Sequence, residues 1–232
     1  NVGNFTKSDG SSGAPEQWTP IGYEDKPYTG IFDGGNHTIK GLYVNSTSDN
    51  VGLFGYVGSG GTIQNVGVID GYIKGKDHVG GVCGLNRGTI QDCDNKGTVT
   101  GTNYVGGVCG YNLGTIQNCH NEGTVNATRS NVGGVCGYNS ATIQTSYNTG
   151  TVTGTDSVGG VCGTNRDTIE TCYNTGSVSG NNYVGGVCGY NWIRIIQNCY
   201  NTGTVTGKSF SVGGVCGYNL GTIQTSYNAG TV

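Results

Sequence analysis

The sequence predicts an all-β fold, a right-handed parallel β-helix with about 26 residues and three short strands in each turn. The first observation behind this prediction is a repeat: the core V-G-G-V-C-G occurs six times, and a looser copy, V-G-L-F-G-Y, starts at Val51. The second is the spacing of these cores, 26 to 28 residues, which is too short for the ~40-residue blade of a β-propeller. The third is the content of a unit, where Val, Ile and Thr alternate with corners rich in Asn and Gly. The right-handed sense follows from the handedness rule for parallel β crossovers.

Composition narrows the function classes. The chain has 232 residues, 47 of them Gly and none Met, and only 11% are charged, with a net charge of -3. A chain with so little positive charge has no basic face for nucleic acid. No apolar run approaches the ~20 residues of a membrane-spanning helix. We therefore expect neither nucleic-acid binding nor membrane insertion, and the start at Asn1 leads us to expect a monomeric piece of a longer chain.

The chain divides into two parts. Residues 1–27 are irregular, and we expect a leader or cap over the first turn, anchored by Trp18 and Ile21; the alternative is a partly ordered leader. Residues 28–232 form the predicted β-helical domain. Its first turn, 28–50, is atypical, as solenoid ends usually are. The regular units begin at residues 51, 79, 105, 132, 158, 184 and 212.

Each regular unit contains three pieces that favour extended structure, as in V-G-G-V-C-G, T-I-Q-N-C and G-T-V-T-G. In the third piece the central Val is predicted to point inwards. In the second, Ile and Cys are three residues apart, which breaks strict alternation, so we expect a bend with both side chains inward. The inward side of the first piece stays open. The Asn residues that follow G-Y and Y are predicted to form corners and amide ladders.

The ten cysteines fall into two columns. The first column follows V-G-G-V, and we interpret its thiols as structural core: Cys83, Cys109, Cys136, Cys162, Cys188 and Cys216. The second consists of Cys93, Cys119, Cys172 and Cys199. Disulfides between the columns are the alternative, but Cys136 and Cys216 persist where the second column has Ser146 and Ser226. No cysteines have the close paired spacing of a zinc site, and no other signal suggests a cofactor, so we expect no metal and no cofactor.

At this point the residues carry a resemblance. The stretch Val105–Gly110, followed by Gly114–Val125, resembles the GLUG repeats of bacterial cell-surface proteins, including adhesin-like proteins and IgA1-cleaving metallopeptidases. The resemblance covers residues 18 to 232. It implies a secreted or surface-displayed β-helical module without catalytic residues in the repeats. The metallopeptidases carry H-E-x-x-H elsewhere, and this chain has only scattered histidines, so peptidase activity does not transfer.

Three surface features are candidates for binding. One is a column of tyrosines whose flat rings suit sugars or proteins: Tyr147, Tyr173, Tyr200 and Tyr227, continued by His120 and Asp94. A second, broken column has Tyr111, Tyr138, Tyr190 and Tyr218. The third is Trp192, where W-I-R-I-I inserts one residue into the usual corner. Each has a structural alternative, namely a stabilising ladder of stacked rings for the tyrosines and a tolerated loop change for Trp192.

Two other functions are weighed against binding. A carbohydrate-active β-helix enzyme would need paired carboxylates, and we expect no two acids of the repeats to share a column in adjacent turns. Paired outward Thr residues, such as Thr98/Thr100 and Thr204/Thr206, resemble ice-binding ranks, although Asn126 and Ser179 interrupt them. The sequence therefore favours a non-catalytic extracellular module, a stalk or adhesive β-helix, whose partner is a host glycan or an extracellular protein.

Overall fold

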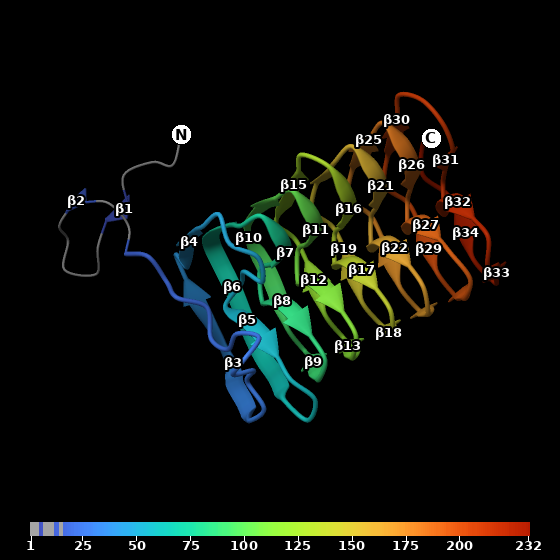
Figure 1. The fold of residues 1–232 in the computed structure, drawn as a ribbon. Coiled ribbons are helices and arrows are strands. Elements are labelled where there is room, and N and C mark those ends of the chain that lie inside the picture. Colours follow the sequence, from blue (N-terminus) through green and yellow to red (C-terminus); the bar gives the residue numbers. More distant parts are fainter. Residues whose placement is uncertain (1–4, 7–11, 14–15) are drawn as a thin grey trace.

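The chain winds into a coil of stacked turns with parallel strands, as Figure 1 shows. The structure is a computed structural model that describes Phe5–Thr6, Ser12–Gly13 and residues 16–232. Within these ranges it contains no helix, and so none that is long and apolar enough to cross a lipid bilayer. The predicted all-β parallel solenoid is confirmed, whereas its right-handed sense stays a prediction.

A regular turn contains five short strands, not three. In the turn that starts at residue 103 they are β11 (Asn103–Gly106), β12 (Cys109–Asn112), β13 (Thr115–Gln117), β14 (His120–Asn121) and β15 (Thr124–Ala127). The expected first piece divides at Gly106-Gly107. The second divides at Asn118, whose φ of 52° is left-handed and interrupts the strand.

Equivalent strands pair in parallel from turn to turn. A six-stranded sheet contains β7 (Asp77–Gly80), β11, β16 (Ser130–Gly133), β21 (Asp156–Gly159), β26 (Asn182–Gly185) and β31 (Val212–Gly213). A seven-stranded sheet contains β5 (Phe54–Val57), β8 (Cys83–Asn86), β12, β17 (Cys136–Asn139), β22 (Cys162–Asn165), β27 (Cys188–Asn191) and β32 (Cys216–Asn219).

The remaining strands share one large sheet that bends around the coil. Its early members are long: β3 (Ile31–Lys40), β4 (Tyr43–Asn45), β6 (Thr62–Lys74) and β10 (Asp94–Gly101). The T-I-Q strands are β9 (Thr89–Gln91), β13, β18 (Thr142–Gln144), β23 (Thr168–Glu170), β28 (Ile195–Gln197) and β33 (Thr222–Gln224). The Y-N strands are β14, β19 (Tyr147–Asn148), β24 (Tyr173–Asn174), β29 (Tyr200–Asn201) and β34 (Tyr227–Asn228). The T-V strands are β15, β20 (Val152–Thr153), β25 (Val178–Gly180) and β30 (Val205–Gly207).

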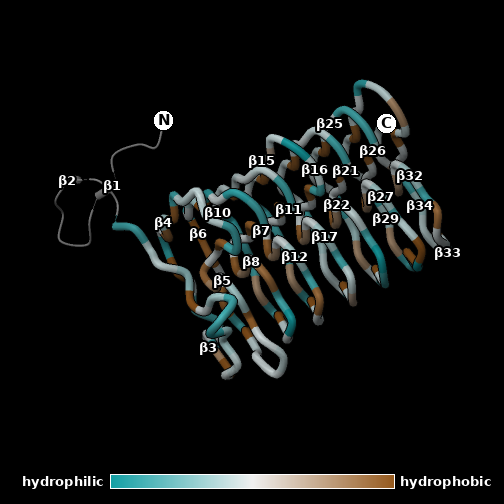
Figure 2. Tube along the Cα trace, in the orientation of Figure 1, coloured by the Kyte–Doolittle hydropathy of each residue, from teal (hydrophilic) through white to brown (hydrophobic). Residues whose placement is uncertain are grey.

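Identical residues stack in register and form the core. Ile116 pairs with Ile143 and Val125 with Val152 in the next turn, and all four side chains are fully buried. Ile116 and Cys119 both point inwards across the left-handed Asn118, which confirms the expected bend. Figure 2 shows the apolar positions recurring at equivalent places along the coil. The interior is thus a set of like-on-like columns that bury apolar surface continuously.

The open question about V-G-G-V-C-G is resolved by close backbone packing. Val105, Val108 and Cys109 are all fully buried, so the piece has no solvent-facing side chain to alternate with. A Cβ on Gly110 would lie 2.5 Å from the backbone of His78 and Val79 in the previous turn. The glycine allows two backbones to approach within a distance that no side chain tolerates.

Two ladders of buried asparagines hold the corners. In each ladder Nδ2 of one Asn donates to Oδ1 of the next at 2.7 to 2.9 Å. The first ladder is Asn86, Asn112, Asn139, Asn165, Asn191 and Asn219, and the second is Asn95, Asn121, Asn148, Asn174, Asn201 and Asn228. Each Asn of the regular turns also bonds the backbone at its own corner, as Asn121 does with the Gly123 carbonyl at 2.9 Å. The predicted amide ladders are confirmed.

The segment before residue 28 contacts the first turn. Ile21 and Tyr28 form parallel bridges to Phe54 and Val57 of β5, and the Trp18 indole donates to the Leu53 carbonyl at 3.1 Å. Residues 18–28 therefore pack on the end of the coil. In the leader before them the structure pairs β1 (Phe5–Thr6) antiparallel with β2 (Ser12–Gly13), and the rest of the expected cap before Glu16 lies outside the described residues.

Candidate functional site: the Trp192 corner

The corner between β27 and β28 departs from the other turns. At the preceding corner Asn165 Nδ2 reaches the carbonyl of Asp167, two residues on, whereas Asn191 Nδ2 reaches that of Arg194, three residues on. The structure thus places the inserted residue inside this corner. The longer loop turns Trp192 and Ile193 outward, leaving them 43% and 57% exposed. Exposed apolar side chains that gather around a hollow are candidates for a contact surface.

Tyrosines from three turns surround the indole. Tyr190 meets Trp192 edge to face, with ring centroids 5.3 Å apart and planes at 90°. Tyr218 stacks on Tyr190 at 5.3 Å, and Tyr183 lies 5.4 Å from Tyr218 at a tilt of 64°. Tyr183 and Trp192 lie at an angle to this stacked pair, and the four aromatic residues together with Ser157 line a pocket of about 290 Å³. We call these five residues the Trp192 corner.

Arg166 lies one turn before Trp192, at the equivalent position after the ladder asparagine. Its guanidinium carbon is 5.2 Å from the centre of the indole, and Nη1 donates to the Tyr138 hydroxyl at 3.2 Å. This hydrogen bond raises the pKa of Arg166. Sequence reasoning missed this arginine, although a usable signal existed, since Arg166 and Trp192 occupy the same place in consecutive units.

The column of Tyr147, Tyr173, Tyr200 and Tyr227 is present, but its geometry differs from a binding platform. His120 and the four tyrosines stack with centroids 4.7 to 5.4 Å apart and planes within 9° of parallel. Each ring face is therefore covered by its neighbour, and the ring edges face outward. The flat faces expected from the sequence are not offered to a ligand, except at Tyr227, which is 57% exposed at the last turn.

A second aromatic group lies further along the same edge as the Trp192 corner. Tyr111 and Tyr138 stack at 4.7 Å, and His78 and Tyr104 pack against Tyr111 at 5.1 and 5.7 Å. Burial lowers the pKa of His78. The broken column is interrupted at Thr164, whose hydroxyl donates to Asn131 at 2.6 Å. The packing of His78 and Tyr104 against this column was not foreseen from the sequence.

The cysteines form two interior stacks. All ten are free thiols, and nine of them are buried, while Cys216 in the last turn is partly exposed. In the first column each pairs in register with the next, as Cys109 does with Cys136. Burial raises the pKa of the Cys83, Cys109 and Cys162 thiols well above the ordinary value. Thiols buried in an apolar interior pack as small hydrophobic groups and are out of reach of a substrate.

The carboxylates mostly occur singly, and Asp92 and Asp94 line one polar pocket together with His37 and His120. Asp49, just before the first regular unit, shares a column with Asp77 of the next turn. The Asp49 carboxylate accepts from the Asp77 amide at 3.2 Å, and that of Asp77 accepts from the backbone and side chain of Asn103 at 3.0 Å each. Both carboxylates therefore accept a hydrogen bond from a backbone amide of the next turn. Asp94 faces a polar pocket beside His120, and burial raises its pKa.

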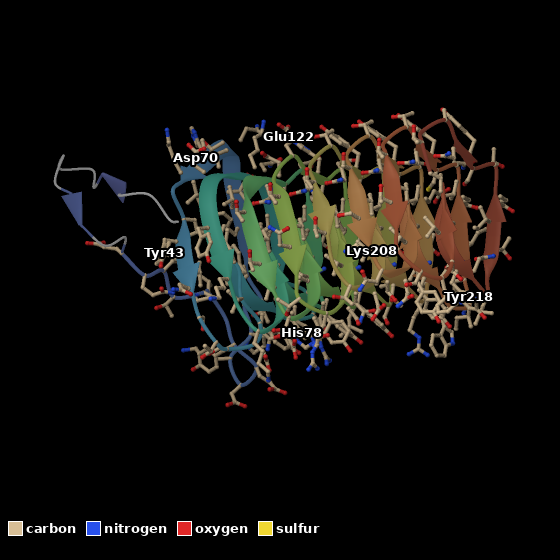
Figure 3. All side chains as sticks on the ribbon, turned by 90° about the horizontal axis from the view of Figure 1, so that it is seen from above. Tyr43, Asp70, His78, Glu122, Lys208 and Tyr218 are labelled. Atoms are coloured by element: carbon tan, nitrogen blue, oxygen red, sulfur yellow. The ribbon has the colours of Figure 1, made fainter. Side chains whose placement is uncertain are left out.

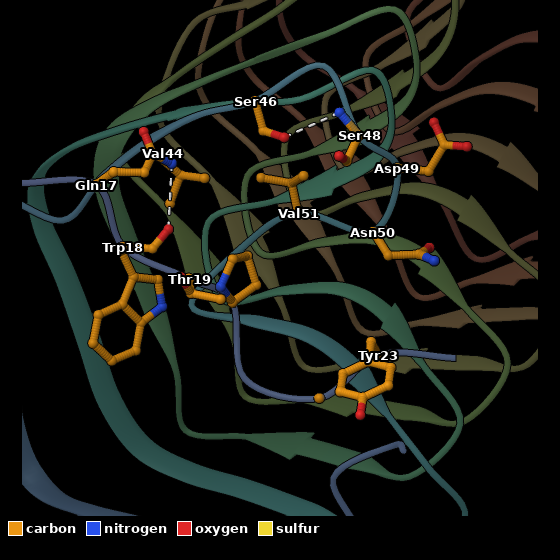
Figure 4. A pocket seen from close by; sticks show the side chains of 12 residues that line it. Gln17, Trp18, Thr19, Tyr23, Val44, Ser46, Ser48, Asp49, Asn50 and Val51 are labelled. Atoms are coloured by element: carbon orange, nitrogen blue, oxygen red, sulfur yellow. Dashed lines mark hydrogen bonds between the residues drawn. The ribbon is translucent and has the colours of Figure 1, made fainter. Parts of the chain in front are cut away.

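Other surfaces offer less to a ligand. Figure 4 shows an open pocket of about 350 Å³ between residues 17–23 and 44–51 at the first turn, where the Ser48 amide donates to Ser46 Oγ at 3.0 Å. The outward hydroxyl rank does align, with Thr153 and Ser179 3.2 Å apart, but Asn126 interrupts it. Across the described residues, no three His, Cys, Asp or Glu side chains are grouped to hold a metal ion.

Known proteins resemble this chain in sequence and in fold. The model of the GLUG motif matches residues 101–126 and 180–206. Over 76 residues, 32% of the chain, it is 42% identical to Halomucin of Haloquadratum walsbyi, of which it spans 1%. Over 79 residues it is 33% identical to a protein named as a Gly-rich membrane protein in Evansella cellulosilytica, of which it spans 9%.

A crystal structure described as an immunoglobulin A1 protease from Bacteroides ovatus superposes on 93% of the chain and matches 65% of that protein. The TM-score is 0.58 and the identity 24%, so this likeness concerns the fold. The chain thus spans about two thirds of that structure and small fractions of the two sequence relatives. Two stretches of the chain therefore match the GLUG motif, and both lie within a coil whose turns repeat with one period.

Proposed function

We propose that this chain is a non-catalytic, surface-displayed β-helical module that binds an extracellular partner through the Trp192 corner. The observation that carries the proposal is the inserted residue, which turns Trp192 and Ile193 outward beside three tyrosines that line a pocket with Trp192. Exposed aromatic residues clustered around a pocket are typical of binding sites. The names of the two sequence relatives, a mucin-like name and a membrane protein, support display at the cell surface.

A binding role is favoured over catalysis by how the polar groups are used. The aligned carboxylates of Asp49 and Asp77 cap backbone amides, and the buried thiols are stacked in the apolar interior, where a substrate does not reach them. A hydrolase of the two-carboxylate type needs one acid and one base that flank an open groove. The adhesive or stalk-like coil needs only a rigid rod and one exposed recognition surface.

The test is an array of glycans and extracellular-matrix proteins probed with the 232-residue chain, Trp192→Ala and Tyr173→Ala. We expect Trp192→Ala to weaken binding by about tenfold or more, the usual effect of truncating a central aromatic contact. Tyr173→Ala is the matched control, because it removes an aromatic ring whose faces are already covered by Tyr147 and Tyr200. Loss of binding in Tyr173→Ala with retention in Trp192→Ala would move the site to the tyrosine column.

A further inference from the structure

The edge that carries the Trp192 corner concentrates unpaired positive charge. Three of the four arginines of the chain lie at copies of this corner, Arg166 and Arg194 in adjacent turns and Arg87 three turns before Arg166. In the described part of the chain, the ion pairs involve lysines and His120 and none of these arginines. Figure 3 shows His78 and Tyr218 along one edge of the coil, with the acids Asp70 and Glu122 along the opposite edge. A molecule with a net charge of -3 thus has a locally cationic edge.

Two acids lie at or beside this corner, Asp167 and Asp156, which precedes Ser157 and accepts a hydrogen bond from Asn182 Nδ2. The Asp167 carboxylate follows Arg166 directly, and it accepts a hydrogen bond from the Thr168 hydroxyl at 3.1 Å. It makes no ion pair with Arg166. The charge of the guanidinium is therefore left for another partner.

Arg166 is held in position but not saturated. Of its five N–H donors, one bonds the Tyr138 hydroxyl, while the plane of the group lies over Trp192. Ordering by a hydroxyl and an indole reduces the entropy that a flexible arginine would lose on binding. The free donors form the planar fork that recognises carboxylates by paired hydrogen bonds.

The complementary apolar element is the pocket lined by Trp192, the residue whose ring Arg166 contacts. Tyr183, Tyr190 and Tyr218 line it with partly open ring faces and with hydroxyls at their rims. Its volume of about 290 Å³ is near the lower limit of small-ligand sites, roughly 300 Å³. A pyranose ring has an apolar C–H face that packs on such rings, and hydroxyls that reach their polar ends.

We infer that the Trp192 corner binds an acidic glycan, with a uronate-type sugar ring against the tyrosines and its carboxylate on Arg166. A neutral glycan would leave the ordered guanidinium unused, and a simple anion would leave the aromatic pocket unfilled. Arg194, exposed in the same loop, adds positive charge for a neighbouring acidic sugar. This inference rests on the proposed binding function and names the ligand class of the same site.

The experiment measures binding of the 232-residue chain to polygalacturonate and to dextran of matched size by titration calorimetry. We expect polygalacturonate to bind and dextran not to bind. Arg166→Gln should weaken that binding by about tenfold or more, the loss typical of a charge-assisted hydrogen bond. Arg166→Lys, which keeps the charge without the planar fork, should show an intermediate loss.

Arg129→Gln is the matched control, because Arg129 is an exposed arginine at a different corner. It should change the affinity by less than about twofold, since it alters net charge equally without touching the site. Thermal unfolding of each variant checks that the coil is intact. Equal binding of both polymers, or equal losses in Arg166→Gln and Arg129→Gln, would overturn the inference.

The two proposals fail in different ways. If the chain ignores polygalacturonate but still binds a neutral glycan or a protein in a Trp192-dependent manner, only the acidic-glycan inference is lost. If no array component binds in a Trp192-dependent manner and polygalacturonate does not bind either, the proposed function itself is refuted.

Discussion

At the scale of single residues, the coil depends on backbone conformations that most side chains avoid. One position, between the T-I-Q strand and the following inward residue, is left-handed in every regular turn. Asn118 and Asn198 suit this conformation, whereas the β-branched Thr145 holds a φ of 50° there. A β-branched residue in the left-handed region is strained. The fold therefore accepts backbone strain at Thr145, because the packing of the adjacent turns holds the chain in this bend.

Replacing Thr145 with Asn should relieve that cost. Thr145 is exposed and its φ is positive, so Asn, which several other turns use, should stabilise the fold by about 0.5–1 kcal/mol. Urea unfolding measures the change in free energy. Thr149→Asn serves as the control, because Thr149 is exposed but is not left-handed. An equal gain in both variants would show that left-handed strain at position 145 is not the cause.

At the scale of elements, the asparagine ladders fix the turns to one another. Asn148 donates to Asn174 at 2.7 Å and to the Gly150 carbonyl at 2.9 Å, and it accepts from Asn121 at 2.8 Å, all in the interior. The side chain of Asn148 therefore satisfies polar atoms in three consecutive turns. Because no solvent reaches these amides, removing one of them leaves the amide groups of the adjacent turns without hydrogen-bond partners.

Asn148→Ala should accordingly destabilise the coil by about 2 kcal/mol or more, since each buried polar group left unpaired costs about 1–3 kcal/mol. Asn228→Ala, in the same ladder but in the exposed last turn, should cost clearly less, because water replaces the lost partner. Denaturant unfolding of the two variants gives the comparison. Similar losses at the two positions would mean that the ladder does not act through buried hydrogen bonds.

The elements also show what the sequence could predict. Period and β-branched content were enough for the parallel coil, its register, the inward Val of T-V-T and the inward Ile and Cys of T-I-Q-N-C, whereas the inward side of V-G-G-V-C-G stayed open. The asparagine ladders followed from the same period. The five strands per turn did not, because the break at Asn118 depends on a backbone angle that Asn permits but does not require.

Ring geometry lay beyond sequence reasoning as well. A shared column places Tyr147 beside Tyr173 but does not say whether their faces cover each other or lie open. The packing of His78 and Tyr104 against Tyr111 depends on how one turn sits over the next. Trp192 was identified as an exposed irregularity, yet its pairing with Arg166 became clear only when the turns were stacked.

At the scale of the whole molecule, each turn contacts only its neighbours. Stability in such a coil is a sum of turns and of interfaces between adjacent turns. Fraying therefore begins at the ends, and interior turns open only with larger units. The partial exposure of Cys216 and Ile223, whose counterparts in earlier turns are buried, fits this view.

Hydrogen exchange in the 232-residue chain should show that local stability falls from the interior turns to the ends of the coil. The amides of Tyr173 and Tyr227 make equivalent bonds to the previous turn, at 3.2 Å to Ser146 and 3.0 Å to Cys199. We expect Tyr227 to exchange faster by at least about tenfold, because its turn is supported on one side only. Equal protection of the two amides would instead indicate a coil that opens as a single unit.

The direction of the hydrogen bonds between turns has a mechanical consequence. These bonds run along the axis of the coil, so a pull on its two ends loads the turns in series and opens them one at a time. A turn contributes ~4.8 Å to the folded rod. Once released, its roughly 26 residues extend to about 90 Å of chain. A module tethering a surface to a moving partner would therefore lengthen in steps under load, with the remaining turns still folded.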